Sequence, residues 1–89
     1  MSRVIFADAF VDALADVQSE RVAQRIIRLV SYLEDMPELG SADLPESVKR
    51  RYGVRARKLV ATPFDILCTY DAELDEVHVD GLVHQRAVV

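Results

Sequence analysis

Two stretches of the sequence decide the fold, Phe64-Asp65-Ile66-Leu67-Cys68-Thr69-Tyr70 and Glu76-Val77-His78-Val79-Asp80-Gly81-Leu82-Val83-His84. In both, the side chains fall into two sets with a period of two, which predicts β-strands. The connection 71–75 is short and polar, as in an antiparallel hairpin. We expect one face of the hairpin to pack on a core and the other to carry functional residues. The expected core face holds Phe64, Ile66, Cys68, Tyr70, Val77, Val79, Gly81 and Val83, and the expected outer face holds Asp65, Leu67, Thr69, His78, Asp80, Leu82 and His84.

A third strand is expected before this hairpin, and a fourth near the start of the chain. The segment 55–60 predicts the third strand, with its turn at 61–63, and Arg3-Val4-Ile5-Phe6 predicts the fourth. A crossover is expected to place the first strand beside one of the later strands, parallel to it.

Two helices are predicted between the first strand and the others. Asp8 is expected to cap a helix over 9–17, and Ser19 a longer helix over 20–36 that Pro37 ends. A loop over 37–47 and a helical turn within 46–53 follow. The predicted class is α+β, a two-helix hairpin packed on one face of a mainly antiparallel four-stranded sheet in the order β-α-α-β-β-β.

The two helices carry opposite charges on their outer faces. Asp8, Asp12 and Asp16 repeat every four residues on the first helix, and Arg21, Arg25 and Arg28 follow similar spacing on the second. We expect the two sets to pair within the helical hairpin. Alternatively, both charged faces are simply exposed to solvent, or the arginines contact the phosphates of a nucleic acid.

Length and charge limit the classes of function. The chain has 89 residues, which predicts one domain over 1–89, and no apolar run suits a signal peptide or a membrane span, so we expect a cytoplasmic protein without membrane contact. A net charge of −4 disfavours broad nucleic-acid binding, although 49–58 forms a dense basic segment. Cys68 is expected to be a buried structural thiol.

The chain resembles the RelE/ParE superfamily of toxins from type II toxin–antitoxin, or plasmid stabilisation, systems. The resemblance rests on Val4-Ile5-Phe6 before a helical hairpin, Pro37-Glu38-Leu39-Gly40, Arg57-Lys58-Leu59, the stretch 63–70 and the closing Val83-His84-Gln85-Arg86. It implies a toxin neutralised by a cognate antitoxin, as a homodimer or in a heterotetramer with that antitoxin. It further implies one of two actions. ParE-like members of the superfamily poison DNA gyrase, whereas RelE-like members are mRNA interferases that cut mRNA on the ribosome without a metal or other cofactor.

The resemblance also suggests site residues, which the outer sheet face is expected to present. Lys58, His84 and Arg86 are the candidate catalytic residues, and Arg55 and Arg57 the candidate phosphate or target contacts. Ala56 and Asp65 stand where cutting members carry basic residues, and no later tyrosine follows, so gyrase poisoning is preferred over RNA cutting. A ribosome-dependent endoribonuclease and a non-toxic antitoxin-binding module stay open, as do ordinary strand charges for Arg57 and Lys58 and a surface pair between His78 and Asp80.

Overall fold

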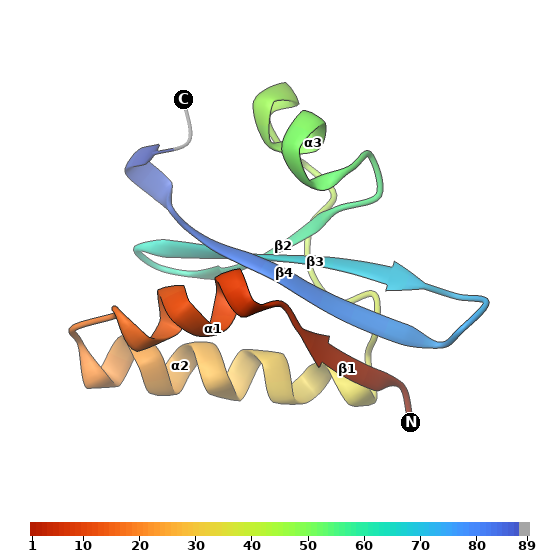
Figure 1. Cartoon of the computed structure of the whole chain (residues 1–89), viewed down its shortest axis with the longest axis horizontal. Helices are drawn as coiled ribbons and strands as arrows, with labels where there is room; N and C mark the ends of the chain where they lie inside the picture. Colours follow the sequence, from red (N-terminus) through yellow and green to blue (C-terminus); the bar gives the residue numbers. More distant parts are fainter. Residues whose placement is uncertain (88–89) are drawn as a thin grey trace.

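A computed structural model describes residues 1–87, which fold around a four-stranded sheet of order β1-β4-β3-β2. The strands are β1 (Arg3–Phe6), β2 (Arg57–Ala61), β3 (Phe64–Asp71) and β4 (Glu76–His84). β3 runs antiparallel to both of its neighbours, β2 and β4, and β1 lies parallel to β4 (Figure 1). The α+β class, the strand order along the chain and the parallel first strand are confirmed. The predicted third strand begins two residues late, so Arg55 lies outside the sheet.

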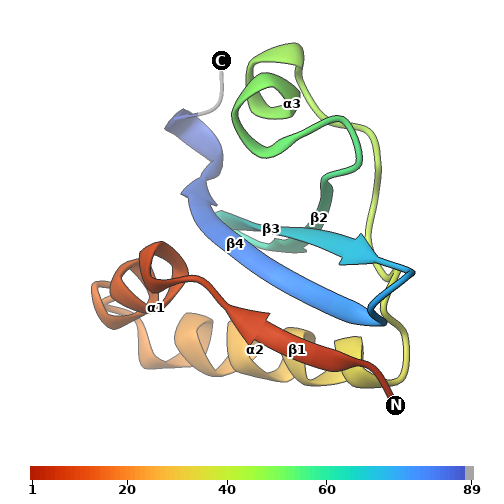
Figure 2. The ribbon, with the colours of Figure 1, turned by 45° about the vertical axis from the view of Figure 1, so that its right-hand side comes forward.

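Helices lie on both sides of this sheet. α1 (Asp8–Ala15) and α2 (Glu20–Ser31) form the predicted hairpin on one face, and the short α3 (Glu46–Tyr52) lies on the opposite side (Figures 1 and 2). The 3-10 helices η1 (Tyr32–Glu34) and η2 (Gln85–Ala87) follow α2 and β4. Ser19 caps α2 as predicted, because its side chain accepts a hydrogen bond from the Val22 N–H.

The predicted ends of the two long helices need correction. Ala7, not Asp8, is the N-cap of α1, and Asp8 is the first helical residue. α2 ends at Ser31 rather than continuing to Met36. The Ser31 hydroxyl donates to the Arg28 carbonyl at 2.6 Å, so it shares the acceptor that the Tyr32 N–H would use in an α-helix. Tyr32 bonds to the Leu29 carbonyl instead, which begins the 3-10 turn.

The main core lies between the sheet and the α1–α2 hairpin. Ile26 and Leu33 of the helical layer, and Ile66, Val77 and Val79 of the sheet, are all fully buried there. Burying side chains of this size gives about 1.5–3 kcal/mol each. A second, smaller cluster lies on the other side of the sheet under α3 and consists of Leu44, Val48, Ala56 and Leu67, with Tyr52 and Val83 against it.

A β-bulge changes the predicted faces of β4. Leu67 pairs with Gly81 but Cys68 pairs with Val79, so Asp80 is the extra residue on β4. Before the bulge, Val77 and Val79 face the main core as predicted. After it, Leu82 packs on the main core whereas Gly81 and Val83 turn to the other side. The prediction that Gly81 and Val83 share the core face, and Leu82 and His84 the outer face, is therefore wrong.

The turn between β3 and β4 is tied to the start of the chain through Asp75. Its carboxylate accepts hydrogen bonds from the Ser2 hydroxyl at 2.6 Å and from the Tyr70 hydroxyl at 2.7 Å, and its carbonyl accepts from the Arg3 N–H at 3.0 Å. The Ser2 hydroxyl, followed by that of Tyr70, lowers the pKa of Asp75, and Asp75 in turn raises the pKa of Tyr70. The ionised carboxylate and the neutral phenol together stabilise this junction.

Asp75→Asn is expected to lower the thermal stability near neutral pH and to lose that effect in acid. The folded pKa of Asp75 lies below its usual 3.8, so the carboxylate contributes stability above pH 3.8, and that contribution is lost as pH falls through the folded pKa. Asn tolerates the positive φ of 51° at this position, which makes the substitution specific for charge. Melting temperatures of both proteins measured from about pH 3 to about pH 8 should converge at the acid end; a gap that stays constant with pH would contradict this role.

Candidate functional site

We call the side of the sheet opposite α1 and α2 the open face. In antiparallel strands, residues directly opposite each other project to the same side. Leu67 and Val83 contact the cluster under α3, so their partners Lys58, Gly81 and Asp65 share that side. The open face is formed by Lys58, Val60, Asp65, Leu67, Thr69, His78, Asp80, Gly81 and Val83.

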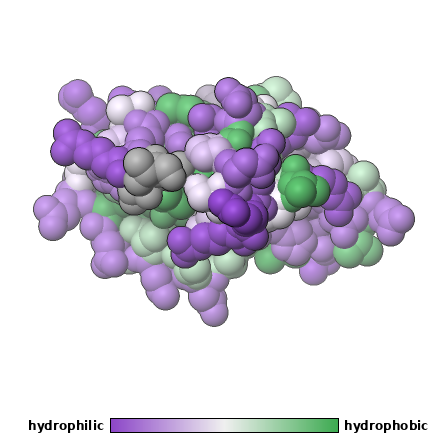
Figure 3. All heavy atoms as spheres, turned by 90° about the horizontal axis from the view of Figure 1, so that it is seen from above, coloured by the Kyte–Doolittle hydropathy of each residue, from purple (hydrophilic) through white to green (hydrophobic). Residues whose placement is uncertain are grey.

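α3 covers part of the open face. Val48 of α3 is buried with Ala56 and Leu67, and Tyr52 packs beside them. Gly81 allows this close approach, because a Cβ built on it would lie 2.8 Å from the Tyr52 hydroxyl oxygen. Viewed from above, the molecule presents mostly hydrophilic residues, with a few hydrophobic ones scattered among them (Figure 3). Because α3 packs here, only part of the outer sheet face is free to present the predicted site residues.

Lys58 lies on the open face as predicted, and its backbone is held from both sides. It pairs with Leu67 of β3, and on the outer edge of β2 its N–H and carbonyl bond to Ser41 at 2.9 Å each. The loop can approach this closely because Gly40 adopts a φ of +114°, and a Cβ there would lie 2.6 Å from the Lys58 carbonyl oxygen. The lysine side chain is therefore presented from a well-supported backbone.

His84 does not share a face with Lys58, which corrects the prediction that the two lie together. Its partner is Phe64, which packs on the main core, and the two rings meet edge to face at 5.3 Å. His84 Nδ1 accepts a hydrogen bond from the Arg86 N–H at 3.1 Å, which favours the tautomer protonated at Nε2. His84 faces away from Lys58 because of the bulge at Asp80, where one extra residue reverses the sides to which the following side chains of β4 point.

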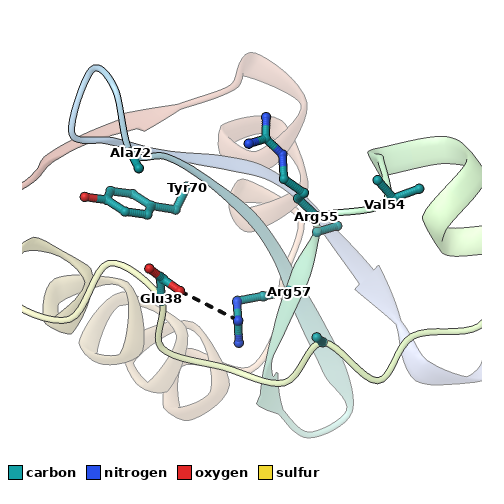
Figure 4. Close-up of a pocket in the computed structure, with 8 residues that line it drawn as sticks. Glu38, Val54, Arg55, Arg57, Tyr70 and Ala72 are labelled. Atoms are coloured by element: carbon teal, nitrogen blue, oxygen red, sulfur yellow. Dashed lines mark ion pairs between the residues drawn. The ribbon is translucent and has the colours of Figure 1, made fainter.

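The other candidate residues occupy three different settings. Arg86 is exposed in η2, and Arg55 is exposed in the loop before β2. Arg57 is engaged within the chain, since its guanidinium donates to the Gly40 carbonyl at 3.2 Å and lies 3.8 Å from the Glu38 carboxylate (Figure 4). Asp65 is half-buried on the open face and accepts a hydrogen bond from the Gln85 side-chain amide at 3.1 Å.

Two hollows flank Arg55. The first, of about 330 Å³, contains Glu38, Arg57 and Tyr70 (Figure 4). The second, of about 390 Å³, lies on the open face, between the end of α3 and strands β3 and β4. The second hollow is lined by Arg51, Tyr52, Arg55, Thr69, Tyr70, Asp71, His78 and Asp80.

The second hollow combines groups that the sequence analysis did not assign to one site. The Arg51 guanidinium lies 5.3 Å from the centre of the Tyr52 ring, and His78 lies 3.4 Å from Glu76. Asp80 accepts from the Thr69 hydroxyl at 2.8 Å, so the predicted surface pair of His78 with Asp80 is replaced by two separate contacts. Guanidinium groups and an aromatic ring suit contact with phosphate and a base, whereas the two aspartates oppose an anion. In the sequence, only the dense basic segment 49–58 had pointed to this part of the molecule.

Comparison with known proteins identifies the fold. No family model and no curated protein matches the sequence. A chain of the crystal structure of the intact E. coli RelBE toxin–antitoxin complex is similar in structure, with a TM-score of 0.68 over 94% of this chain and 96% of that chain. The chain has a RelE/ParE-like fold. Sequence identity over this match is 13%, so the likeness is one of architecture, and the RelE/ParE-like core of β1, the helical hairpin and β2–β4 extends over nearly the whole chain.

Two further observations concern residues 1–87 of the chain. No helix there combines the length and the apolar character that a membrane crossing requires. No three His, Cys, Asp or Glu side chains in the same range are grouped closely enough to hold a metal ion.

Proposed function

We propose that this chain is the toxin of a type II toxin–antitoxin pair and is held inactive in the cytoplasm by an antitoxin encoded beside it. The observation that carries the proposal is the RelE/ParE-like fold, matched over 94% of the chain by a chain from a toxin–antitoxin complex. An antitoxin partner also suits the exposed apolar side chains, which include Val60 on β2 and Val54 before it.

Within this function, we propose a ParE-like action in which the protein inhibits DNA gyrase by binding it rather than by cutting RNA. Metal-free RNA cutting needs cations that neutralise the pentacovalent phosphate and groups that move protons to and from oxygen. Here Asp65 places a carboxylate on the face of Lys58, Ala56 is buried, and His84 lies on the other side of the sheet. Each of these features weakens a cutting site around Lys58.

A RelE-like, ribosome-dependent mRNA endoribonuclease is the second candidate. It is favoured by the second hollow, where Arg51, Arg55 and His78 lie near the ring of Tyr52. In that reading Arg51 and Arg55 contact the phosphate, and His78 takes over the proton transfer first assigned to His84. Lys58 and Arg86 do not line this hollow and contact the RNA beside it. A non-toxic module that only binds the antitoxin is the third candidate.

Inducing the chain alone in a bacterial host is expected to arrest growth, and co-expression of the adjacent small reading frame is expected to relieve the arrest. Accumulation of gyrase–DNA breaks would support the ParE-like action. Primer extension on translated mRNA that shows breaks within codons would support cutting instead. Normal growth at a verified level of soluble protein would rule out both toxin readings.

Alanine variants test the residues assigned to RNA cutting. If the protein cuts RNA, Lys58→Ala and Arg86→Ala should lower cleavage by about 100-fold or more, whereas Arg50→Ala, an exposed change on α3, should leave it unchanged. If the protein acts by binding gyrase, cleavage should be absent from the unmodified chain. Cleavage that persists in both variants would remove Lys58 and Arg86 from the site.

A further inference from the structure

The first hollow lies beside the start of β2 and has no part in the proposed function. Arg57 pairs with Cys68, a residue of the main core, and Tyr70 packs against the same core. Their side chains therefore leave the sheet on the side opposite Lys58. Figure 4 shows these two side chains around the hollow of about 330 Å³, together with Arg55 and Glu38.

Arg57 is only partly neutralised by the groups around it. Among the described residues, its guanidinium donates one hydrogen bond, to the Gly40 carbonyl at 3.2 Å. The Glu38 carboxylate lies 3.8 Å away, which is within ion-pair range but too long for a hydrogen bond. A guanidinium carries five N–H donors, so most of those of Arg57 are left for another acceptor. The side chains of Arg57 and Glu38 are 35% and 64% exposed, so a ligand can reach both.

Arg55 adds a second positive charge to the first hollow. It is exposed, and within residues 1–87 its guanidinium forms no ion pair. The two guanidinium groups of the lining outnumber its one carboxylate, that of Glu38, although the whole chain has a net charge of −4. One further carboxylate would balance this local charge, whereas a phosphate dianion would exceed it. The charge of the hollow therefore favours a carboxylate as the partner of Arg55 and Arg57.

The rest of the lining is apolar. The Tyr70 hydroxyl is already engaged, because it donates to the Asp75 carboxylate at 2.7 Å, so the phenol ring offers mainly its carbon surface to the hollow. Val54 also lines the hollow and is 85% exposed. Three small residues complete the wall, namely Ala42, Ala56 and Ala72. A ligand that carries an apolar group beside its carboxylate would remove this surface from water as well.

We propose that the first hollow binds a peptide segment of a partner protein in which a glutamate or aspartate stands next to an apolar residue. The ligand carboxylate accepts hydrogen bonds from Arg55 and Arg57, and the apolar residue packs on Val54 and the ring of Tyr70. The ligand displaces Glu38, which holds the place of the ligand carboxylate in the free chain. A peptide fits better than a small anion, because only a longer ligand also covers Val54. This binding does not depend on toxicity or on the target of the toxin.

Nuclear magnetic resonance of the ¹⁵N-labelled chain tests this proposal with a capped peptide, acetyl-Ala-Glu-Leu-amide, whose only charge is on the glutamate. Titration should shift the backbone amides of 54–57 and the side-chain Nε–H signals of Arg55 and Arg57, and should approach saturation at millimolar peptide. The same peptide with glutamine, acetate alone and inorganic phosphate should each bind at least about 10-fold more weakly. No shift with up to about 10 mM peptide would overturn the proposal, as would equal binding of any of these three probes.

Charge changes in the chain separate a ligand-binding role from a structural one. Arg55→Glu and Arg57→Glu should each raise the peptide dissociation constant by about 10-fold or more, because a carboxylate then faces the ligand carboxylate. Glu38→Gln should lower the constant by about 3-fold, because it removes the competing charge. Arg57→Lys keeps the charge without the paired donors of a guanidinium, so it should weaken binding less than Arg57→Glu does.

Arg50→Glu on α3 and Glu34→Gln in η1 are the matched controls, because both residues are exposed and neither lines the first hollow. Both variants should bind the peptide as the unmodified chain does. The amide spectrum of each variant reports whether it is folded. Arg55 forms no ion pair within residues 1–87, so Arg55→Glu keeps the test informative even if Arg57→Glu disturbs the neighbouring loop.

Two results from the variants would contradict the proposal. Weaker binding by Glu38→Gln would show that Glu38 positions Arg57 instead of competing with the ligand. Unchanged binding by both Arg55→Glu and Arg57→Glu would show that the peptide binds elsewhere on the chain.

Discussion

Replacing Phe10 by alanine is expected to lower the free energy of unfolding by about 3–5 kcal/mol, the usual cost of truncating a buried phenylalanine. Phe10 is 2% exposed and joins α1 to the core that Val77 and Val79 of β4 help to form. A domain of this size has only about 5–15 kcal/mol of stability, so the loss is a large share of the total. For 60–100 residues, each kcal/mol shifts the melting temperature by about 4–8 °C, so we expect a fall of at least about 12 °C.

Phe6→Ala is the matched control for this prediction. The rings of Phe6 and Phe10 stack with centroids 5.7 Å apart, but Phe6 is 43% exposed at the end of β1. Its truncation should cost about 1 kcal/mol, because less apolar area returns to water and no closed cavity is left. Chemical denaturation of the three proteins measures both losses. Equal losses at the two positions would show that α1 is not anchored through Phe10.

Cys68 is expected to react with iodoacetamide at least about 1,000-fold more slowly in the folded protein than in the denatured chain. The thiolate is the reacting species. Burial, with a smaller contribution from Asp80, raises the pKa of Cys68 from 9.0 to about 12. At about pH 8 this shift lowers the thiolate fraction by about 1,000-fold, and the 3% exposure of the side chain limits access further.

Mass spectrometry of samples quenched over time measures this rate, with the chain in guanidinium as the fully reactive control. Because labelling then proceeds through opening of the sheet, Phe10→Ala should accelerate it and Phe6→Ala should change it much less. Rapid labelling of the unmodified folded protein would mean that Cys68 is not enclosed between β3 and the helical hairpin. It would also remove the basis for the predicted structural thiol, which the burial of Cys68 supports.

Much of the fold follows from local patterns in the sequence. The alternation in 64–70 and 76–84 located β3 and β4 to within one residue at each end, since pleating alone sets a period of two. The apolar stripe of Val22, Ile26 and Leu29 predicted α2, and Ser19 its start. The end of α2 was missed because the chain continues from Ser31 directly into the 3-10 turn Tyr32–Glu34, whose Leu33 prolongs the apolar pattern of the helix.

The candidate site was less predictable, because it depends on which elements meet. Lys58 and Asp65 share a face as alternation predicted, whereas the bulge at Asp80 moved His84 to the other one. The basic segment 49–58 was noticed, but its division among α3, the loop at Arg55 and the Glu38–Arg57 contact was not. Tyr52 carries no sequence signal, and it becomes relevant through its position over Gly81.

The sequence by itself determined the elements, their order and the opposite charges carried by the two long helices, because periodicity and capping act over a few neighbouring residues. Tertiary structure decided which groups meet. The extra residue at Asp80 reversed the end of β4, α3 covered part of the open face, and the separate packing of α1 and α2 left Asp12 and Arg25 without a mutual ion pair. These outcomes depend on register and packing between segments distant in the chain, and such contacts leave no local pattern to detect.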